Sequence, residues 1–382
     1  MSLSDAARAI RPTLIREFRA RATSESLDLG IGQPDLPVPQ PVRRAATEAI
    51  ADGHAPYSDN LGLPATRRAV ADHYGLEADQ TMITCGVQQG LAVAIFGLVD
   101  PGDEVLVPDP GFPAYPNLVR AAGAEPVAYP LDPQADFALD PDAVAERITV
   151  DTTALLLNSP SNPTGRVHRP EAIAALVDLL AERGVRWIAD DIYENYLYEG
   201  VEHTSPAALR AGHRGGLRLG GLSKSMHIMG WRLGWVTGPA DWIGQLKPLH
   251  QHLVTCAPTP AQRAAVAALD DFGGLFGPTL ETFAERRELA VERSRALPGI
   301  DAVSPEGAFY LFLDARSYTS EGATDSLSLA EEILDETGVV LIPGSGFGAG
   351  GEGFLRVAYT VDCRRLAEAF DRLDAFFTRR AG

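Results

Sequence analysis

Short apolar runs alternate with longer stretches of helical apolar spacing over the first two thirds of the chain. Such runs, bounded by glycine, proline or asparagine, are typical of buried strands. Within 104–129, strand, helix and strand follow one another, so parallel pairing is expected. We predict an α/β region with strands at 81–84, 104–107, 125–129, 153–157, 185–189, 217–219 and 233–237. Its helices are expected at 41–52, from 63, from 86, at 115–123 and at 170–183.

Beyond residue 240, helices and strands mix without a parallel run, which is typical of a smaller α+β domain. We predict helices at 258–271, 275–297, 327–337 and 361–378, and strands at 300–303, 309–313, 339–342 and 354–357. The division expected is an N-terminal arm and pocket loop at 1–40 that belongs to the small domain, a large domain at 41–275 and a C-terminal small domain at 276–382.

Five residues of different chemistry follow directly after predicted strands. In open α/β sheets, ligands bind beside the carboxyl ends of the strands. Any single residue at that edge could be there for ordinary structural reasons, whereas five of different chemistry at the same edge favour a binding site. These residues are Gly86, Phe112, Asn162, Asp190 and Lys224.

Lys224 lies in the glycine-rich stretch 221–235. The chain has only two lysines, Lys224 and Lys247, and the remaining 31 of its 33 basic residues are arginines. Arginine can replace a surface lysine, but it keeps its proton and cannot form a Schiff base. Lys247 fits a leftover surface lysine, whereas the retention of Lys224 indicates amine chemistry.

Two neighbours of Lys224 suit a phosphate group. Ser223 precedes it and Arg232 follows eight residues later, which supplies a hydroxyl and a fixed cation. The turn at Gly86 opens a helix after a strand, so free N–H groups and the positive end of the helix dipole meet there. Lysine, serine and arginine together suit an aldehyde that bears a phosphate.

Arg356 lies inside the apolar strand predicted at 354–357. A buried arginine is costly unless it has an anionic partner. The residue is therefore either a ligand-binding cation or an edge residue that points to solvent, and the strand pattern leaves both alternatives open.

Composition restricts the class of protein. The length allows two domains with a complete core, and 45% apolar and 7% aromatic residues are ordinary for a globular enzyme. We find no apolar run of transmembrane length and no signal segment. A net charge of −18 argues against nucleic acid or an anionic membrane as a partner. Cys85, Cys256 and Cys363 are far apart and lack metal-site spacing, so we expect no metal and a cytoplasmic location.

Ten segments match, in order, those of the class I and II aminotransferases, and the chain resembles this family of fold-type I enzymes nearly from end to end. The segments are LGIGQPD, YSDNLG, CGVQQG, GDEVLVPDPGFPAY, NSPSNPTG, ADDIYE, SK…GWRLGW, GAFYLF, PGSGFG and FLRVAYT. The resemblance implies an α/β fold whose large domain has a mostly parallel seven-stranded sheet between helices, beside a smaller α+β domain. It also implies pyridoxal 5′-phosphate as the cofactor.

The resemblance implies a role for each residue around the cofactor ring. Lys224 is similar to the lysine that forms the internal Schiff base and then moves the proton between substrate and cofactor. Asp190 resembles the partner of the pyridine nitrogen, which it keeps protonated. Tyr193 and Asn162 resemble the groups that bond the phenolate oxygen, and Phe112 resembles the ring that stacks on the cofactor.

Phosphate and substrate contacts follow from the same resemblance. The phosphate groups are the backbone of Gly86, Val87 and Gln88 together with Ser223 and Arg232. Tyr57 resembles a residue that reaches the phosphate of the neighbouring subunit, which implies a homodimer. Arg356, helped by Asn162 and the Gly32 N–H, resembles the arginine that binds the substrate α-carboxylate in two places.

Three positions depart from the family pattern. His227 stands where a small residue is usual, and contact with the cofactor, the dimer interface or ordinary packing are all open. Gly221 replaces a hydroxyl found in many members, which removes one expected phosphate contact. Phe112 replaces the more common tyrosine and still allows stacking.

The function implied is transfer of an amino group between an L-amino acid and a 2-oxo acid, by a ping-pong mechanism through Schiff-base intermediates. A role in specialised metabolism stays open. One alternative is a lyase or cyclase that acts by β- or γ-elimination with the same cofactor residues. A more remote one is a non-catalytic cofactor-binding sensor. The substrate side chain is not readable from the sequence, and the net charge slightly disfavours dicarboxylic acids.

Overall fold

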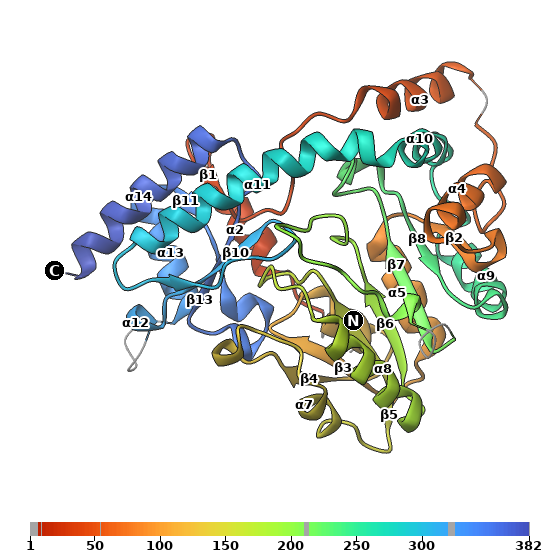
Figure 1. Cartoon of the computed structure of the whole chain (residues 1–382), viewed down its shortest axis with the longest axis horizontal. Coiled ribbons are helices and arrows are strands. Elements are labelled where there is room, and N and C mark those ends of the chain that lie inside the picture. Colours follow the sequence, from red (N-terminus) through yellow and green to blue (C-terminus); the bar gives the residue numbers. More distant parts are fainter. Residues whose placement is uncertain (1–6, 9, 54, 210–213, 320–324, 382) are drawn as a thin grey trace, which may run out of the picture.

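The computed structural model describes residues 7–8, 10–53, 55–209, 214–319 and 325–381 (Figure 1). A large part of the chain surrounds a seven-stranded sheet, and a smaller part surrounds a four-stranded sheet. The long helix α11 (Phe272–Ala296) extends from the large part into the small part, where it packs against α14 (Cys363–Ala381).

The large sheet has the strand order β2–β8–β7–β6–β5–β3–β4. From β7 to β4 neighbouring strands pair in parallel, whereas β8 runs antiparallel to both β2 and β7. The predicted mostly parallel sheet is confirmed, and each predicted strand is present. The bounds are β2 Thr81–Thr84, β3 Glu104–Asp109, β4 Glu125–Pro130, β5 Thr152–Asn158, β6 Arg186–Asp190, β7 Gly216–Gly220 and β8 Gly234–Thr237.

Helices cover both faces of this sheet, which explains its continuous apolar strands. In β6, Trp187 and Ala189 join the core on one face, and Ile188 joins the core on the other. The helices here are α3 Gln40–Ala51, α4 Pro64–Tyr74, α5 Val87–Leu98, α6 Ala114–Ala121, α7 Pro141–Ala145, α8 Pro170–Arg183, α9 Ala240–Val254 and α10 Thr259–Asp270. Short 3-10 helices are η1 Ala78–Gln80, η2 Pro133–Ala135, η3 Pro206–Ala208 and η4 Met229–Trp231.

The small part contains an antiparallel sheet of order β12–β13–β10–β9. Its other elements include α12 Arg316–Thr319, α13 Ser326–Thr337, η5 Gly344–Phe347 and η6 Ala349–Gly351, and its strands are β9 Asp301–Ala302, β10 Tyr310–Asp314, β12 Ile342–Pro343 and β13 Phe354–Ala358. The single strand predicted at 339–342 is wrong. Residues 339–340 form β11, which pairs with β1 (Leu27–Asp28), whereas β12 pairs with β13, so the chain changes sheets at Leu341.

The N-terminal arm is tied to the small part. It contains α2 (Leu14–Arg21) and β1, and β1 pairs in parallel with β11. This pairing supports the assignment of residues 1–40 to the small domain, although the three-part division stays a prediction.

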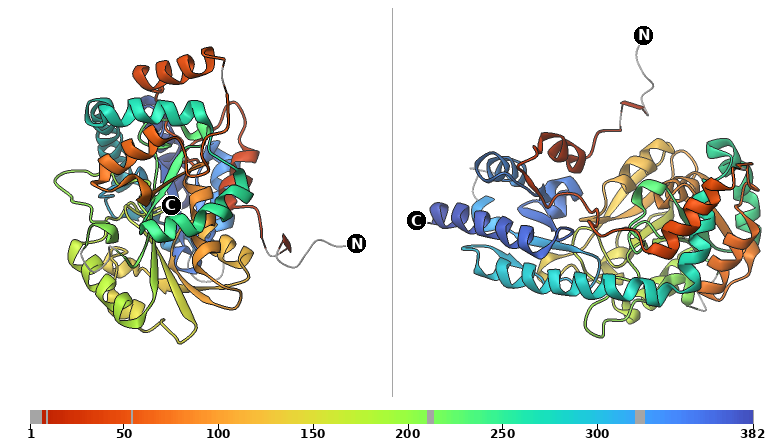
Figure 2. Two further views of the ribbon diagram at one scale, coloured as in Figure 1. Left: turned by 90° about the vertical axis from the view of Figure 1, so that its right-hand side faces the viewer. Right: turned by 90° about the horizontal axis from the view of Figure 1, so that it is seen from above.

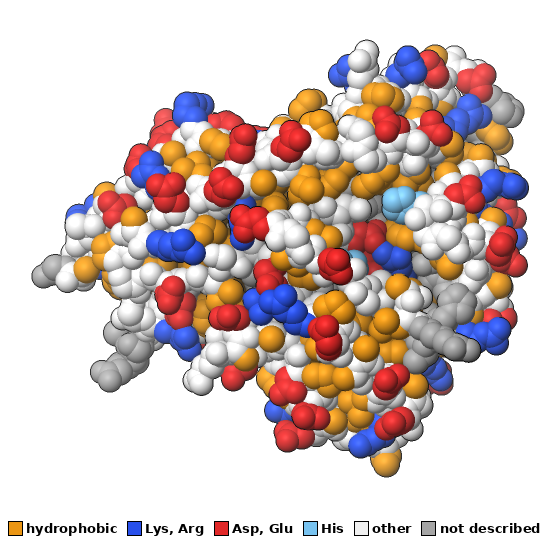
Figure 3. Space-filling model, in the orientation of Figure 1, with side chains coloured by type: hydrophobic (Ala, Val, Ile, Leu, Met, Phe, Trp, Pro, Cys, Tyr) orange, Lys and Arg blue, Asp and Glu red, His pale blue; other side chains and the backbone are white. Residues whose placement is uncertain are grey.

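The surface carries charges of both signs. Figure 3 shows acidic and basic side chains interspersed with apolar ones on one face, so the negative net charge is not gathered into one patch there. Figure 2 shows α3 at the outer edge of the molecule, where it packs against α10. Across the described residues, no helix is both long enough and apolar enough to cross a membrane.

Candidate active site

An open cavity of about 840 Å³ lies beside the carboxyl ends of the central strands. Eleven of the predicted site residues line it: Gly32, Val87, Gln88, Phe112, Asn162, Asp190, Tyr193, Ser223, Lys224, Arg232 and Arg356. Two do not. Gly86 lies directly behind the cavity wall, before α5, and Tyr57 lies outside the cavity in the loop between α3 and α4.

Lys224 follows β7 in a tight loop, and its side chain enters the cavity. Its Nζ donates a hydrogen bond to the Gly32 carbonyl at 2.7 Å. Burial lowers the pKa of Lys224 to about 8, and the positive charges of Arg356 and Arg232 add to that effect. The amine therefore loses its proton more readily than a surface lysine does, which suits a nucleophile or a base.

Asp190 ends β6 and is buried. Its Oδ2 accepts a hydrogen bond from the Tyr115 hydroxyl at 2.9 Å, and its Oδ1 accepts one from the Ile192 N–H at 3.3 Å. Burial raises the pKa of Asp190 to about 6, although both of these hydrogen bonds oppose the rise. A buried carboxylate that lines a cavity is suited to bind a protonated nitrogen.

Tyr193 lies three residues after Asp190 and shares a hydrogen bond with Tyr310, at 2.7 Å between the two hydroxyl oxygens. Burial raises the pKa of both hydroxyls, so both stay protonated near neutral pH. Because both tyrosines line the cavity, the pair can donate a hydrogen bond to an anionic oxygen there.

Arg356 is 1% exposed, on β13 between β10 and β12. The solvent-facing alternative is therefore wrong. Its Nη1 donates to Asn162 Oδ1 at 2.8 Å and its Nη2 donates to the Gly30 carbonyl. The guanidinium carbon lies over the rings of Tyr310 and Phe347, at 4.5 and 4.7 Å from their centroids.

The partners of Arg356 are all neutral. Its Nε has no acceptor, and no carboxylate forms an ion pair with it among the described residues. Burial lowers its pKa, yet an arginine stays charged in proteins. A buried cation without an anion, at the wall of a cavity, is a place for an anionic ligand.

The other end of the cavity suits a phosphate. Gly86 has a φ of 79°, and an added Cβ would lie 2.4 Å from Nη2 of Arg232. Only glycine therefore allows this guanidinium to pack against the start of α5, beside the amides of Val87 and Gln88. Within the described part of the chain, the hydrogen bonds of Arg232 go to the carbonyl oxygens of Met229 at 2.8 Å and Cys85 at 3.4 Å. Helix amides and an arginine without an acid partner form an anion site.

Two of the three departures noted in the sequence, Gly221 and His227, have structural explanations. At Gly221, an added Cβ would lie 3.1 Å from Gly234 and from Val87, so a hydroxyl-bearing residue would be crowded. His227 does not line the cavity. Its Nδ1 lies 3.0 Å from the Pro37 carbonyl and its Nε2 lies 3.4 Å from Thr279 Oγ1, which makes it a packing residue between the pocket loop and α11.

Several cavity residues escaped the sequence reasoning. Tyr115 and Asn158 lie in recognised segments where another residue, Phe112 or Asn162, was given the role, and Tyr310 lies in the recognised segment GAFYLF, where no residue was given one. Their presence in these segments was the only feature of the sequence that could have indicated a role in the site. The arm residues Arg11 and Arg16 also line the cavity, and no local pattern distinguished them from other surface arginines.

Comparison with known proteins agrees with this geometry. The sequence profile of the family described as aminotransferase class I and II matches residues 24–373. An aspartate aminotransferase of Pyrococcus horikoshii is 31% identical and covers 96% of this chain and 94% of its own. An aromatic-amino-acid aminotransferase of Thermococcus litoralis is 32% identical with 98% coverage of both chains. A solved aspartate aminotransferase of Thermus thermophilus with maleate superposes with a TM-score of 0.91, at 33% identity, over 98% of this chain and 99% of that one.

Proposed function

The chain belongs to the class I and II aminotransferases, and on that premise we propose how its own residues carry out the reaction. The protein is a pyridoxal-phosphate-dependent enzyme that transfers an amino group between an amino acid and a 2-oxo acid. The observation that carries the assignment of roles is the position of Lys224 in one cavity with Asp190 and Arg356. The elimination and cyclisation alternative is not favoured, because relatives over nearly the whole chain are named aminotransferases.

The cavity residues fit the cofactor at each of its polar groups. Lys224 offers an amine of lowered pKa to an aldehyde, and Asp190 offers a buried carboxylate to a pyridine nitrogen. The absence of a side chain at Gly86 leaves space for the Arg232 guanidinium beside the amides that begin α5. Together these groups supply the positive charge and the N–H donors that a phosphate needs. The residues that would hold the cofactor are Gly86, Val87, Gln88, Phe112, Asn162, Asp190, Tyr193, Ser223, Lys224 and Arg232. When bound, pyridoxal phosphate supplies an aldehyde that condenses with amines and a ring that withdraws electrons from the substrate Cα.

The chain's own residues then divide the work. Lys224 would be the nucleophile that holds the cofactor, and its Nζ would be the base that moves the Cα proton of the substrate. Asp190 keeps the ring nitrogen protonated. Arg356 binds the α-carboxylate with its two terminal nitrogens, in place of the neutral acceptors it has now, and Gly32 contributes its N–H.

A homodimer is part of the proposal. Tyr57 is 83% exposed, and Ile50 on the adjacent α3 is also exposed. Large exposed apolar side chains on neighbouring elements are typical of an interface. We assign Tyr57 to the phosphate of the partner subunit's cofactor. We expect the Tyr57→Phe variant to remain a dimer and to bind the cofactor more weakly. A cofactor affinity equal to that of the original protein would contradict the assignment.

The charge of the cavity points to a substrate with a second carboxylate. Among the described residues that line it, Arg11, Arg16, Arg232, Arg356 and Lys224 are basic and Asp190 alone is acidic. The cofactor phosphate and the α-carboxylate account for Arg232 and Arg356, which leaves the two arm arginines. Neither has an acidic partner within the described structure. The distant surface charge that disfavoured dicarboxylic acids is screened, whereas these groups act at close range.

An acidic amino acid agrees with the relatives named aspartate aminotransferase. The variant Arg16→Ala tests this, with Arg19→Ala as its matched control, because Arg19 lies on the same helix but not at the cavity. We expect Arg16→Ala to raise the KM for aspartate roughly tenfold or more and to leave the KM for alanine unchanged. Equal losses for both substrates would contradict the acidic-substrate proposal.

A cytoplasmic location also stays part of the proposal. All three cysteines are free thiols and partly buried, which suits a reducing compartment.

The whole assignment is tested in one half-reaction. The cofactor-loaded enzyme is mixed with L-aspartate without any oxo acid. We expect stoichiometric conversion to the aminated cofactor and release of one oxo acid per subunit. Release of ammonia, or turnover in the Lys224→Ala variant at the normal rate, would overturn the proposal.

A further inference from the structure

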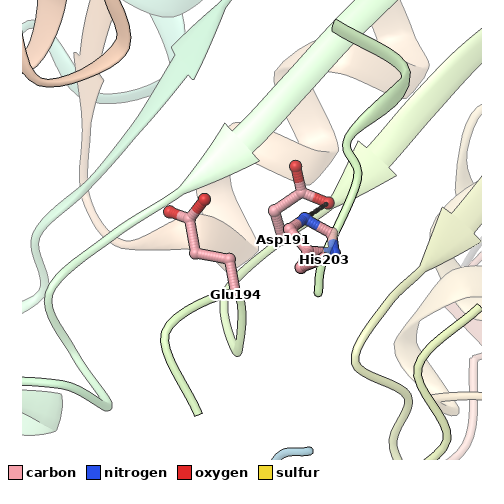
Figure 4. A group of neighbouring side chains, drawn as sticks. All are labelled: Asp191, Glu194 and His203. Atoms are coloured by element: carbon pink, nitrogen blue, oxygen red, sulfur yellow. Dashed lines mark ion pairs between the residues drawn. The ribbon is translucent and has the colours of Figure 1, made fainter. Parts of the chain in front are cut away.

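A second cluster of ionisable side chains lies directly behind the cavity wall. Asp191, Glu194 and His203 place their ligand atoms within 4.8 Å of one another (Figure 4). Asp191 is buried, and its Oδ1 lies 3.6 Å from Nε2 of His203. None of these residues lines the cavity, and nothing in the reaction described above uses them.

This cluster already contains its cation. Arg218 Nε lies 2.8 Å from Asp191 Oδ2, and its Nη2 donates to Glu194 Oε2. The remaining Glu194 oxygen accepts a hydrogen bond from Tyr74 at 2.5 Å. The Arg218 guanidinium also lies 3.9 Å from the centroid of the Tyr74 ring. A metal ion would have to displace this arginine, so we assign the carboxylates to Arg218.

Cavity and cluster lie on opposite sides of one strand end. Arg218 on β7 is level with Ala189 of β6, and Leu219 is level with Asp190. Alternate residues of a strand face opposite sides of the sheet. Leu219 packs in the core on the α5 face, so Arg218 points to the other face, away from Asp190 and its Tyr115 partner.

The turn between Asp190 and Glu194 connects the two sides. It carries Asp190 and Tyr193 to the cavity, whereas Asp191 and Glu194 go to Arg218. Its backbone is held at Asp191 N–H, which donates to the Leu219 carbonyl at 3.0 Å, and at Glu194 N–H, which donates to the Asp191 carbonyl at 2.9 Å.

We propose that Arg218 is a positioning residue for the aminotransferase reaction, an inference that rests on the proposed function. By binding Asp191 and Glu194 together, it fixes both ends of the turn that presents Asp190 and Tyr193 to the cofactor. Its Nη2 hydrogen bonds to Glu194, whereas its Nε lies within ion-pair distance of Asp191 without a hydrogen bond. A planar guanidinium can hold both carboxylates at once, whereas a lysine ammonium is a point charge on a flexible stem.

Arg218 also acts on the charge of Asp190. The Asp191 carboxylate is its direct neighbour in the chain, and unpaired it would oppose ionisation of Asp190. Burial alone would raise the pKa of Asp191, yet His203 and Arg218 hold it below its ordinary value. The cluster therefore keeps Asp191 ionised and its charge compensated. The titratable groups that act on Asp190 from the surrounding elements are Tyr115, Asp191, Tyr193, Lys224 and Tyr310.

The experiment compares three variants of the cofactor-loaded enzyme. Arg218→Met removes the charge and both ion pairs, and Arg218→Lys keeps the charge without the planar fork. Arg186→Met is the matched control, because Arg186 is a partly buried arginine of the neighbouring strand whose guanidinium donates to the distant Leu98 carbonyl. The measurements are the cofactor dissociation constant, kcat and KM, and the pH midpoint of the bound cofactor's absorbance change.

For Arg218→Met we expect kcat to fall at least tenfold while KM changes less than threefold, since Arg356 on β13 holds the substrate independently. The absorbance midpoint should move upward by about one pH unit, because uncompensated carboxylates favour protonation nearby. Arg218→Lys should recover part of the midpoint shift but little of kcat. Arg186→Met should match the original protein in each measurement.

The inference is overturned if Arg218→Met matches Arg186→Met in kcat, cofactor affinity and midpoint, whatever its thermal stability. A chelator-sensitive loss of activity in the original protein would also overturn it, because a metal would then occupy the cluster. If Arg218→Met does not fold, Glu194→Gln replaces it, since glutamine keeps the size and the Tyr74 contact. An unchanged midpoint and kcat in Glu194→Gln would then contradict the inference. An original protein that binds the cofactor but transaminates nothing would instead contradict the proposed function.

Discussion

Two of the arginines that lie in strands, Arg356 and Arg218, differ in what surrounds them. Arg356 faces the cavity with neutral oxygens and aromatic rings as its partners. Arg218 lies behind the cavity wall between two carboxylates. Both are largely buried cations in apolar strands, yet of the two only Arg218 forms ion pairs with carboxylates of the described chain, whereas Asp28 acts on Arg356 from outside ion-pair distance.

This difference separates an arginine that is available to bind a ligand from one that stabilises the structure around the site. An ion pair completed within the protein stabilises the position of its members. A buried cation left without an anion costs stability and is available to a ligand. Lys224 and Arg232 also lack a carboxylate partner, although Arg232 is an exposed cation and not a buried one. Among the described residues, the acceptors of their hydrogen bonds are carbonyl oxygens. We therefore expect the anionic cofactor and substrate to bind at these charges.

Removal of Arg218 gives the largest expected effect. Arg218→Met leaves Asp191 and Glu194 buried without their cation, which costs about 3–5 kcal/mol of unfolding free energy. Urea denaturation of the cofactor-free protein measures it. A loss of unfolding free energy below about 1 kcal/mol, equal to that of Arg186→Met, would contradict the distinction drawn between Arg218 and Arg356.

Removal of Arg356 should affect activity and spare stability. Arg356→Met deletes the cation for the α-carboxylate, so kcat/KM falls roughly 30- to 1000-fold. The free energy of unfolding should change by less than about 1 kcal/mol or rise, because an uncompensated buried charge is lost. Steady-state kinetics and urea denaturation on the same preparation test both parts. A stability loss as large as that of Arg218→Met would contradict the distinction.

The pH dependence of cofactor binding should follow Asp190. Its pKa of about 6 means that the carboxylate is ionised above that pH and is protonated as the pH falls through it. Affinity should therefore decline below pH 6, by about tenfold per unit at the limit. The ratio of affinities in the original protein and Asp190→Asn cancels the titration of the phosphate itself. A ratio independent of pH would exclude Asp190 as the group responsible.

The smallest effect is expected at Tyr115. Tyr115→Phe removes a hydrogen bond that opposes the rise in the pKa of Asp190. The midpoint for cofactor binding should then move upward by about half a unit, and affinity at neutral pH should fall only about threefold. Tyr129→Phe is a suitable control, because that buried hydroxyl donates to the Leu156 carbonyl instead. Equal shifts in both variants would indicate a general packing effect.

Much of the fold was readable from the sequence because strand, turn and helix each leave a local pattern. The seven strands of the large sheet and the edge that carries Asp190 and Lys224 follow from apolar runs and the residues after them. The split at Leu341 was not readable, since 339–342 is one continuous apolar run. Its division depends on partners from both ends of the chain.

Site residues could be predicted where their neighbours in the sequence indicate their chemistry. They could not be predicted where their role depends on residues that are distant in the sequence. Lys224 was distinguished by its rarity and its neighbours. Arg356 and Arg218 occupy similar sequence surroundings, FLRVA and GLRLG, and no local feature reveals that one faces carboxylates and the other does not. Tyr115 and Tyr310 acquire their roles only through contacts across the fold.

The central claim is that Lys224 holds the cofactor, and the two lysines of the chain make a direct test possible. The cofactor-loaded protein is reduced with borohydride, digested and mapped by mass spectrometry. Lys247, which pairs with Asp59 at the surface, is the internal control. We predict one reduced cofactor per chain, on Lys224 alone, in the original protein and in Lys247→Ala. Cofactor on Lys247, or none on either lysine, would contradict the account.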